Sequence, residues 1–103
     1  MKHGDRILVV EDDADLGDLL CDLLRTEGYD ATRVSDGDQA VEQVANDPPD
    51  AIVLDIMLPG MDGFEVCQRL KFRRDTNLIP ILMLTALDDD KARGKGLRVG
   101  ADR

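Results

Sequence analysis

Short apolar runs alternate with longer amphipathic stretches along the chain. Three of the runs, at 7–10, 51–54 and 81–84, contain no polar residue at all. Such runs are typical of strands whose two faces are both covered. The stretches between them carry apolar residues at helical spacing, and this alternation is typical of parallel strands joined by crossover helices. The pattern therefore predicts an α/β fold built on a parallel sheet.

The pattern resolves into strands and helices in strict alternation. The strands are expected at 6–10, 30–34, 51–55 and 80–85, and the helices at about 14–27, 37–45, 63–72 and 89–99. The second strand is the most polar, so we expect it at an edge of the sheet. The third is apolar up to its last residue, so we expect it in the centre.

The clearest helical pattern belongs to the first predicted helix. Leucines recur there at i, i+3, i+4, i+7 and i+8, which predicts a single buried face. They are Leu16, Leu19, Leu20, Leu23 and Leu24. Gly28 follows, and glycine readily takes the left-handed conformation that ends a helix. The last predicted helix contains Gly94 and Gly96, each costing about 1 kcal/mol relative to alanine, so we expect it to be irregular.

Composition narrows the class of protein. The chain has 103 residues, enough for one domain with one core. Its 22 acidic and 13 basic residues give a net charge of -9, which argues against direct binding of nucleic acid by this segment. No apolar run approaches the length of a membrane span, and no signal-peptide core follows the N-terminus, so we expect a cytoplasmic protein without a membrane partner. Cys21 and Cys67 lie in apolar surroundings and are expected to be free buried thiols.

Polar residues follow three of the predicted strands. Glu11, Asp12 and Asp13 come after the first, Asp55 closes the third, and Thr85 closes the fourth. Ligands of open parallel sheets bind beyond the carboxyl ends of the strands. If the first strand lies beside the third and the third beside the fourth, these side chains converge on one small surface.

Each of these residues has a structural alternative, with one exception. Asp12 or Asp13 could cap the following helix, and Thr85 begins a capping-box pattern that ends at Asp88. Asp55 is the exception, because the residues after it do not begin a helix. A carboxylate that closes an apolar strand is costly unless it is paired or binds a metal, so a functional role is favoured for Asp55.

The chemistry of the cluster indicates a cation. Close carboxylates repel one another unless a cation shares them, and oxygen ligands with room for water suit Mg²⁺. With the cation in place, the pocket could accept a phosphoryl group on Asp55 as the nucleophile. Thr85 could donate a hydrogen bond to a phosphoryl oxygen, and the small Ala86 would leave room for the donor. The backbone carbonyl of Met57 is a plausible further metal ligand.

The motifs resemble those of the receiver domain of two-component response regulators. The matching segments are ILVVEDD at 7–13, IVLDIMLPGMDG at 52–63, IPILMLTA at 79–86 and GAD at 100–102. They cover nearly the whole chain in the family's order and spacing. The resemblance implies a flavodoxin-like, doubly wound parallel sheet with strand order 2-1-3-4 for the strands present.

The resemblance also implies a set of roles. Asp55 would accept a phosphoryl group from the phosphohistidine of a sensor histidine kinase or phosphotransfer protein. Glu11, Asp12, Asp55 and the carbonyl of Met57 would hold Mg²⁺. Thr85 would follow the phosphoryl group as the switch hydroxyl and rearrange the fourth strand and the helix after it. Asp13 lies one position beyond the matched acid pair and is assigned to capping.

One departure from the family pattern lies after the GAD segment. Receivers continue into a fifth strand, which ends in a phosphate-binding lysine, and a fifth helix, whereas this chain ends at Arg103. We therefore expect residues 1–103 to form a single receiver domain truncated at its C-terminus. The fourth strand would then be an open edge, so we expect a homodimer formed through that edge or by exchange of elements.

Two other functions compete with a phosphoryl-accepting switch, which is not a multiple-turnover enzyme. An aspartyl phosphatase of the haloacid dehalogenase type needs a second aspartate two residues after the nucleophile, and Met57 occupies that position. A truncated or degenerate receiver that acts only as a protein-interaction and self-association module is the stronger alternative. The intact acid pair, Asp55 and Thr85 argue against degeneration.

Overall fold

A computed structural model of the protein describes residues 4–56, 58 and 61–84. Its strands and helices alternate along the chain as the apolar pattern predicts. The strands are β1 (Arg6–Val10), β2 (Asp30–Val34), β3 (Ala51–Asp55) and β4 (Ile81–Leu84), and the helices are α1 (Ala14–Thr26), α2 (Gly37–Asn46) and α3 (Gly63–Phe72). Each observed boundary lies within one residue of the predicted one. The predicted helix at 89–99 lies outside the described residues.

The strands form one parallel sheet in the order β2-β1-β3-β4. β1 pairs with β2 and with β3, with Val10 opposite both Val34 and Leu54. β3 pairs with β4, with Asp55 opposite Leu84. The predictions of the strand order, of an edge position for β2 and of a central β3 are thus confirmed. The strand order reverses between β1 and β3. From β1 the chain continues outward to β2 at one edge of the described sheet, and from β3 it continues outward to β4 on the other side.

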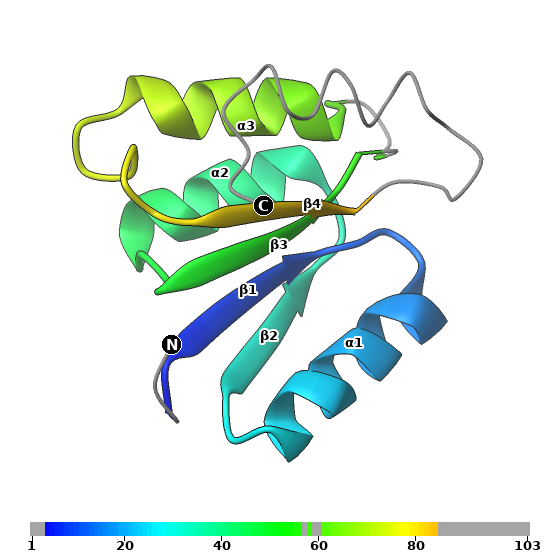
Figure 1. Ribbon diagram of the computed structural model, residues 1–103. Coiled ribbons are helices and arrows are strands. Elements are labelled where there is room, and N and C mark those ends of the chain that lie inside the picture. The colour runs from blue at the N-terminus through cyan, green and yellow to red at the C-terminus, as the bar shows by residue number, and fades with distance from the viewer. Residues whose placement is uncertain (1–3, 57, 59–60, 85–103) are drawn as a thin grey trace.

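The helices cover both faces of the sheet (Figure 1). α1 packs on one face, over β1 and β2, and α2 and α3 pack side by side on the other. The larger apolar core lies under α2 and α3, with Leu8, Leu54, Val66 and Leu70 all nearly inaccessible to water. A smaller core under α1 includes Cys21. Alternate residues of each strand supply the two cores, because successive side chains point to opposite faces.

The predicted buried face of α1 is partly wrong. Leu16, Leu19 and Leu23 are 42%, 55% and 56% exposed, while Leu20 and Leu24 are partly buried against the smaller core. Gly17 and Cys21 are the fully buried residues of α1, so the buried strip is centred on the line from Gly17 through Cys21 to Leu24. A helix lying on two strands buries only this narrow strip, and the leucines on its flank stay outside it.

Aspartates begin all three described helices. The side chains of Asp13, Asp36 and Asp62 each accept a hydrogen bond from the backbone N–H three residues later, as the bond to Leu16 N at 3.1 Å shows for Asp13. Such caps satisfy a free N–H and complement the helix dipole. The assignment of Asp13 to capping is therefore confirmed. α1 ends before Gly28, whose φ of +94° is the left-handed conformation that the sequence predicted.

The two cysteines are free and buried, as predicted. Cys21 lies in the core under α1 and Cys67 in the core under α2 and α3. Burial raises the pKa of the Cys21 thiol, which keeps it in its unreactive neutral form. Of the helices that the structure describes, none has the length and apolarity that a bilayer crossing requires.

Candidate functional site

Three carboxylates meet at the carboxyl ends of β1 and β3. The register places Val10 opposite Leu54, so the next residues along the two strands, Glu11 and Asp55, leave the sheet side by side. Asp12 follows Glu11 in the loop to α1. One carboxylate oxygen from each of Glu11, Asp12 and Asp55 lies within 4.8 Å of the others. The structure thus brings together all three acidic side chains that the sequence predicted as ligands.

The acids of this cluster differ in burial, and this affects their charge. Glu11 is 2% exposed, whereas Asp55 is half-buried and Asp12 is exposed. The pKa of Glu11 is raised from 4.5 to about 7, mainly by burial and then by the hydrogen bond with Asp55. The N–H of Asp13 donates to Glu11 Oε2 at 3.2 Å and acts in the opposite direction. Without a cation, the cluster therefore retains a proton near neutral pH.

The backbone around Asp55 is fixed by its neighbours on two sides. Ile56 N donates to Leu84 O at 3.1 Å, which continues the ladder with β4 just past Asp55. Gly63 N donates to Ile56 O at 2.9 Å and ties the start of α3 to the same point. A β-carbon at Gly63 would lie 2.5 Å from the Asp55 carbonyl oxygen. Only glycine allows the helix to start this close to the strand.

The donor set fits a hard divalent cation. All three groups are carboxylates, the ligand type that Mg²⁺ prefers, and the exposed Asp12 leaves one side open to water. A cation would also favour the charged form of Glu11, whose pKa is raised mainly by burial. The cluster is therefore chemically suited to Mg²⁺ and, through it, to an anionic phosphoryl group.

Comparison with known proteins agrees with this geometry. The family model described as response regulator receiver domain matches residues 7–103. This chain belongs to the receiver domain family. The match covers more than nine-tenths of the chain, and the parallel sheet with acids at the ends of β1 and β3 is the arrangement that the resemblance implied.

Curated relatives of this receiver domain are regulatory proteins. The transcriptional regulatory protein BaeR of Escherichia coli O6:H1 is 47% identical over 101 residues, which are 98% of this chain and 41% of BaeR. The DNA-binding response regulator MtrA of Mycobacterium tuberculosis H37Rv is 48% identical over 97 residues, 94% of this chain and 41% of MtrA. The chain thus spans about two-fifths of the length of these relatives.

Solved structures show the same fold. A response regulator of Chloroflexus aurantiacus superposes with a TM-score of 0.92 at 38% identity, covering 95% of this chain and 80% of that one. The BeF3-activated N-terminal receiver domain of Klebsiella pneumoniae RstA superposes with a TM-score of 0.85, also at 38% identity, covering 94% and 80%. The predicted flavodoxin-like, doubly wound fold is therefore confirmed.

Three predicted site residues of this receiver domain lie close in the chain to described residues but are not themselves among them. Met57, Thr85 and Ala86 lie outside the described residues, so their roles stay predictions. Their neighbours are described: Ile56 and Leu58 flank Met57, and Leu84 precedes Thr85 beside Asp55 in the register.

Sequence reasoning missed two residues beside the acidic cluster. Arg33 lies near the end of β2, and its Nη1 donates to the backbone carbonyl of Glu11 at 2.8 Å. Gly63 is the close-contact residue described above. The sequence offered only a weak signal for Arg33, a basic residue on a strand predicted at the sheet edge. Arg33 binds a backbone carbonyl, and every residue has one, so no residue type in the sequence marks its partner. Gly63 lay inside a recognised motif, but only the packing shows what its missing side chain permits.

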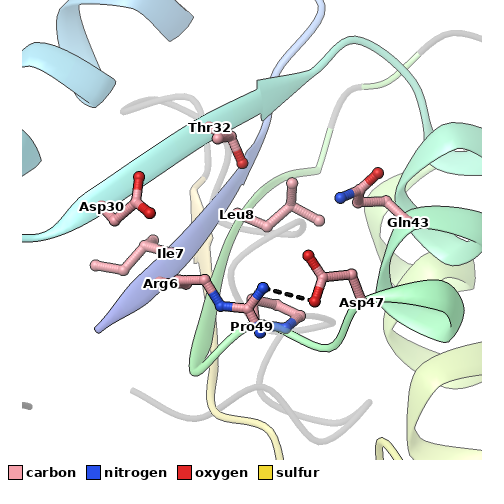
Figure 2. A pocket seen from close by; sticks show the side chains of 8 residues that line it. All are labelled: Arg6, Ile7, Leu8, Asp30, Thr32, Gln43, Asp47 and Pro49. Atoms are coloured by element: carbon pink, nitrogen blue, oxygen red, sulfur yellow. Dashed lines mark hydrogen bonds and ion pairs between the residues drawn. The ribbon is translucent and has the colours of Figure 1, made fainter. Parts of the chain in front are cut away.

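A hollow of about 240 Å³ lies away from the acidic cluster, between β2 and α2 (Figure 2). Its floor includes Leu8, and its walls carry Asp30 from β2 and Asp47 from the end of α2. Arg6 spans the opening, with Nη1 2.6 Å from Asp47 Oδ1. The guanidinium of Arg6 therefore forms an ion pair within the receiver domain, with Asp47. None of the acids predicted as metal ligands lines the hollow.

Proposed function

We propose that this receiver domain is a phosphoryl-accepting switch in two-component signalling. Asp55 takes a phosphoryl group from the phosphohistidine of a sensor histidine kinase or phosphotransfer protein. The observation that carries the proposal is the position of Asp55, which ends the central strand within 4.8 Å of the Glu11 and Asp12 carboxylates. An aspartate in that position has no capping role, because α3 begins only at Gly63.

The transfer is a displacement at phosphorus. A carboxylate oxygen of Asp55 attacks, a P–O bond forms, and the P–N bond to the donor imidazole breaks. The electron pair of that bond stays on the imidazole nitrogen, which then takes a proton from water. The product on this chain is an aspartyl phosphate. The chain is a stoichiometric acceptor in this reaction and not a multiple-turnover enzyme.

Glu11, Asp12 and Asp55 would hold Mg²⁺, together with the backbone carbonyl of Met57. When bound, the cation neutralises charge on the phosphoryl oxygens as they approach the carboxylates. Glu11 contributes from a buried position and Asp12 from the solvent side. This difference leaves the phosphoryl donor an open approach beside Asp12.

The signal would leave the site through β4. Leu84 pairs with Asp55 and accepts a hydrogen bond from Ile56 N. Thr85 follows Leu84 in the chain, directly after the residue of β4 that pairs with Asp55. We propose that the Thr85 hydroxyl follows the phosphoryl group, with Ala86 leaving room for the donor, and that the surface formed by β4 and the segment after it changes as a result.

The decisive experiment is phosphorylation by a small donor. The chain is incubated with acetyl phosphate with and without Mg²⁺, and aspartyl phosphate is measured by intact-mass spectrometry. We expect one Mg²⁺-dependent phosphoryl adduct in wild type, none in Asp55→Asn, and a normal adduct in Asp38→Asn, an exposed control in α2. An equal adduct in Asp55→Asn would overturn the proposal. A folded wild type that gains no adduct would favour the interaction-module alternative.

The names of the relatives favour gene regulation as the output. BaeR is named a transcriptional regulatory protein and MtrA a DNA-binding response regulator. We propose that this receiver domain likewise controls a transcriptional output, and that its own acidic surface does not contact the nucleic acid. The cytoplasmic location remains a prediction.

Self-association through β4 is also proposed. Among the described residues β4 pairs only with β3, and Leu82 in it is 46% exposed. We propose that β4 strands of two copies pair and that the exposed Leu82 packs in this contact. Sedimentation velocity at micromolar concentration should show a dimer, which Leu82→Lys weakens. A stable, folded monomer over that range would contradict the proposal.

A further inference from the structure

Arg33 connects three parts of the molecule. It lies on β2 opposite Val9 of β1, and its side chain crosses the first turns of α1. Nη1 reaches the backbone carbonyl of Glu11 at 2.8 Å, and Nε lies 3.9 Å from Asp18 Oδ1 on α1. The side chain is 26% exposed, so this hydrogen bond is partly shielded from water.

Gly17 makes this path available. It is buried in α1, and a β-carbon there would overlap Arg33 Cδ and lie 3.3 Å from Arg33 Cγ. Glycine inside a helix costs about 1 kcal/mol relative to alanine. Gly17 therefore lowers the stability of α1 at the position where the Arg33 side chain passes over the helix.

The bond from Arg33 completes the attachment of Glu11 to β2. Glu11 N already donates to Val34 O at 3.1 Å. With Arg33 bound to its carbonyl, both backbone polar groups of Glu11 are held by neighbouring residues of one strand. Glu11 is also the most buried member of the acidic cluster, and the position of its backbone limits where its carboxylate can lie.

We propose that Arg33 is a positioning residue for the Mg²⁺ site: it fixes the backbone of Glu11 so that the Glu11 carboxylate faces Asp55. This inference rests on the proposed function, because it assigns Arg33 a part in the same site. Groups that orient metal ligands without touching the metal commonly change metal affinity by about 10-fold or more when removed.

The positive charge of Arg33 opposes the gain in Mg²⁺ affinity that its positioning of Glu11 provides, because a guanidinium near the site repels Mg²⁺. Asp18 lies beside the guanidinium and offsets that charge. Salt separates the two effects, because repulsion across solvent is screened while a lost hydrogen bond is not. We therefore expect the loss of affinity to persist in 0.5 M salt.

Arg25 provides a matched control. Its Nη2 donates to the backbone carbonyl of Ala31 at 2.7 Å, so it too makes a guanidinium-to-carbonyl bond, in this case from α1 to β2. Its target lies at the other end of β2 from the acidic cluster. Arg25→Met therefore removes a comparable bond without touching the loop that carries Glu11.

The test is a calorimetric titration of the chain with Mg²⁺ at 0.1 M and 0.5 M salt. We expect Arg33→Met to weaken Mg²⁺ binding about 10-fold, and Arg25→Met to change it less than about twofold. Gly17→Ala, which displaces the Arg33 side chain, should also weaken it. In phosphorylation by acetyl phosphate, the Mg²⁺ concentration for half-maximal rate should rise in Arg33→Met while the rate at saturating Mg²⁺ is kept.

The outcomes separate the two proposals. If wild type binds Mg²⁺ and Arg33→Met binds it equally well, the positioning role is overturned and the proposed function stands. If Arg25→Met weakens binding as much as Arg33→Met, the effect comes from general loss of stability, and the positioning role is again overturned. If wild type binds no Mg²⁺, the proposed function itself fails. Should Arg33→Met not fold, Arg33→Lys and Gly17→Ala carry the same comparison.

Discussion

Gly63, the first residue of α3, lies against the peptide group of Asp55, the last residue of β3. A β-carbon at Gly63 would lie 2.5 Å from the Asp55 carbonyl oxygen and 2.7 Å from Ile56 Cα. Both of these are backbone atoms, which cannot rotate away as a side chain can. The position of the proposed phosphoryl acceptor is thus tied to the start of a helix eight positions later in the chain.

Gly63→Ala should therefore impair both stability and phosphorylation. Forcing a methyl group against backbone is expected to cost about 1–3 kcal/mol of unfolding free energy, and the displaced strand end should slow phosphorylation by acetyl phosphate. Urea denaturation and an adduct time course measure the two effects. Asp62→Ala is the comparator: it removes the cap on Glu65 N, at a cost of about 1 kcal/mol, but introduces no clash. Equal phosphorylation rates in the two variants would contradict the prediction.

The raised pKa of Glu11 predicts a pH dependence of stability in the metal-free chain. Between the ordinary value of 4.5 and about 7, the folded chain keeps a proton that the unfolded chain has already released. The contribution of Glu11 to the free energy of unfolding therefore falls as the pH rises through that window. Urea denaturation in EDTA at pH 5 and pH 8 should show this fall in wild type and a smaller one in Glu11→Gln.

Glu42→Gln is the control for this experiment, because Glu42 is an exposed residue of α2. It should lose stability with rising pH as wild type does. If the Glu11→Gln and Glu42→Gln profiles coincide, the buried Glu11 carboxyl is not the group responsible.

Mg²⁺ should stabilise the folded chain. A ligand that binds only the folded state adds about 2.7 kcal/mol when present at 100 times its dissociation constant. Thermal unfolding with increasing Mg²⁺ should show this gain, with a larger effect at pH 8 than at pH 6, since Mg²⁺ competes with the proton on Glu11. Asp12→Asn should reduce the gain, and Asp15→Asn, which changes an exposed acid in the first turn of α1, should keep it. A gain that survives in Asp12→Asn would place the cation elsewhere.

The exposed flank of α1 should tolerate substitution. Leu19 is 55% exposed, while Leu70 in α3 is 1% exposed. We expect Leu19→Ala to cost less than about 1 kcal/mol, since alanine is a good helix former and little apolar area is lost. Leu70→Ala should cost about 2–5 kcal/mol because it leaves a cavity in the core. Similar losses in urea denaturation would show that the flank of α1 is covered in solution.

The apolar pattern was sufficient to predict the described strands and helices, the edge position of β2 and the central position of β3, whereas the full strand order was implied by the resemblance to receiver domains. Runs such as 7–10 and 51–54 have no polar face, so they fit only the interior of a covered sheet. Asp13 and Gly28 marked the ends of α1 because capping is a local interaction between residues a few positions apart. The acids at the ends of β1 and β3 could likewise be grouped, since parallel strands share one carboxyl edge.

Tertiary structure decided which members of those patterns are buried and what surrounds the site. The periodicity of α1 assigned five leucines to one buried face, but contact with two strands selected the strip around Gly17 and Cys21 and left Leu16, Leu19 and Leu23 outside. The raised pKa of Glu11 and the bond from Arg33 to its carbonyl depend on neighbours from other strands. Local sequence determines spacing along the chain, whereas burial and hydrogen bonding between strands depend on packing.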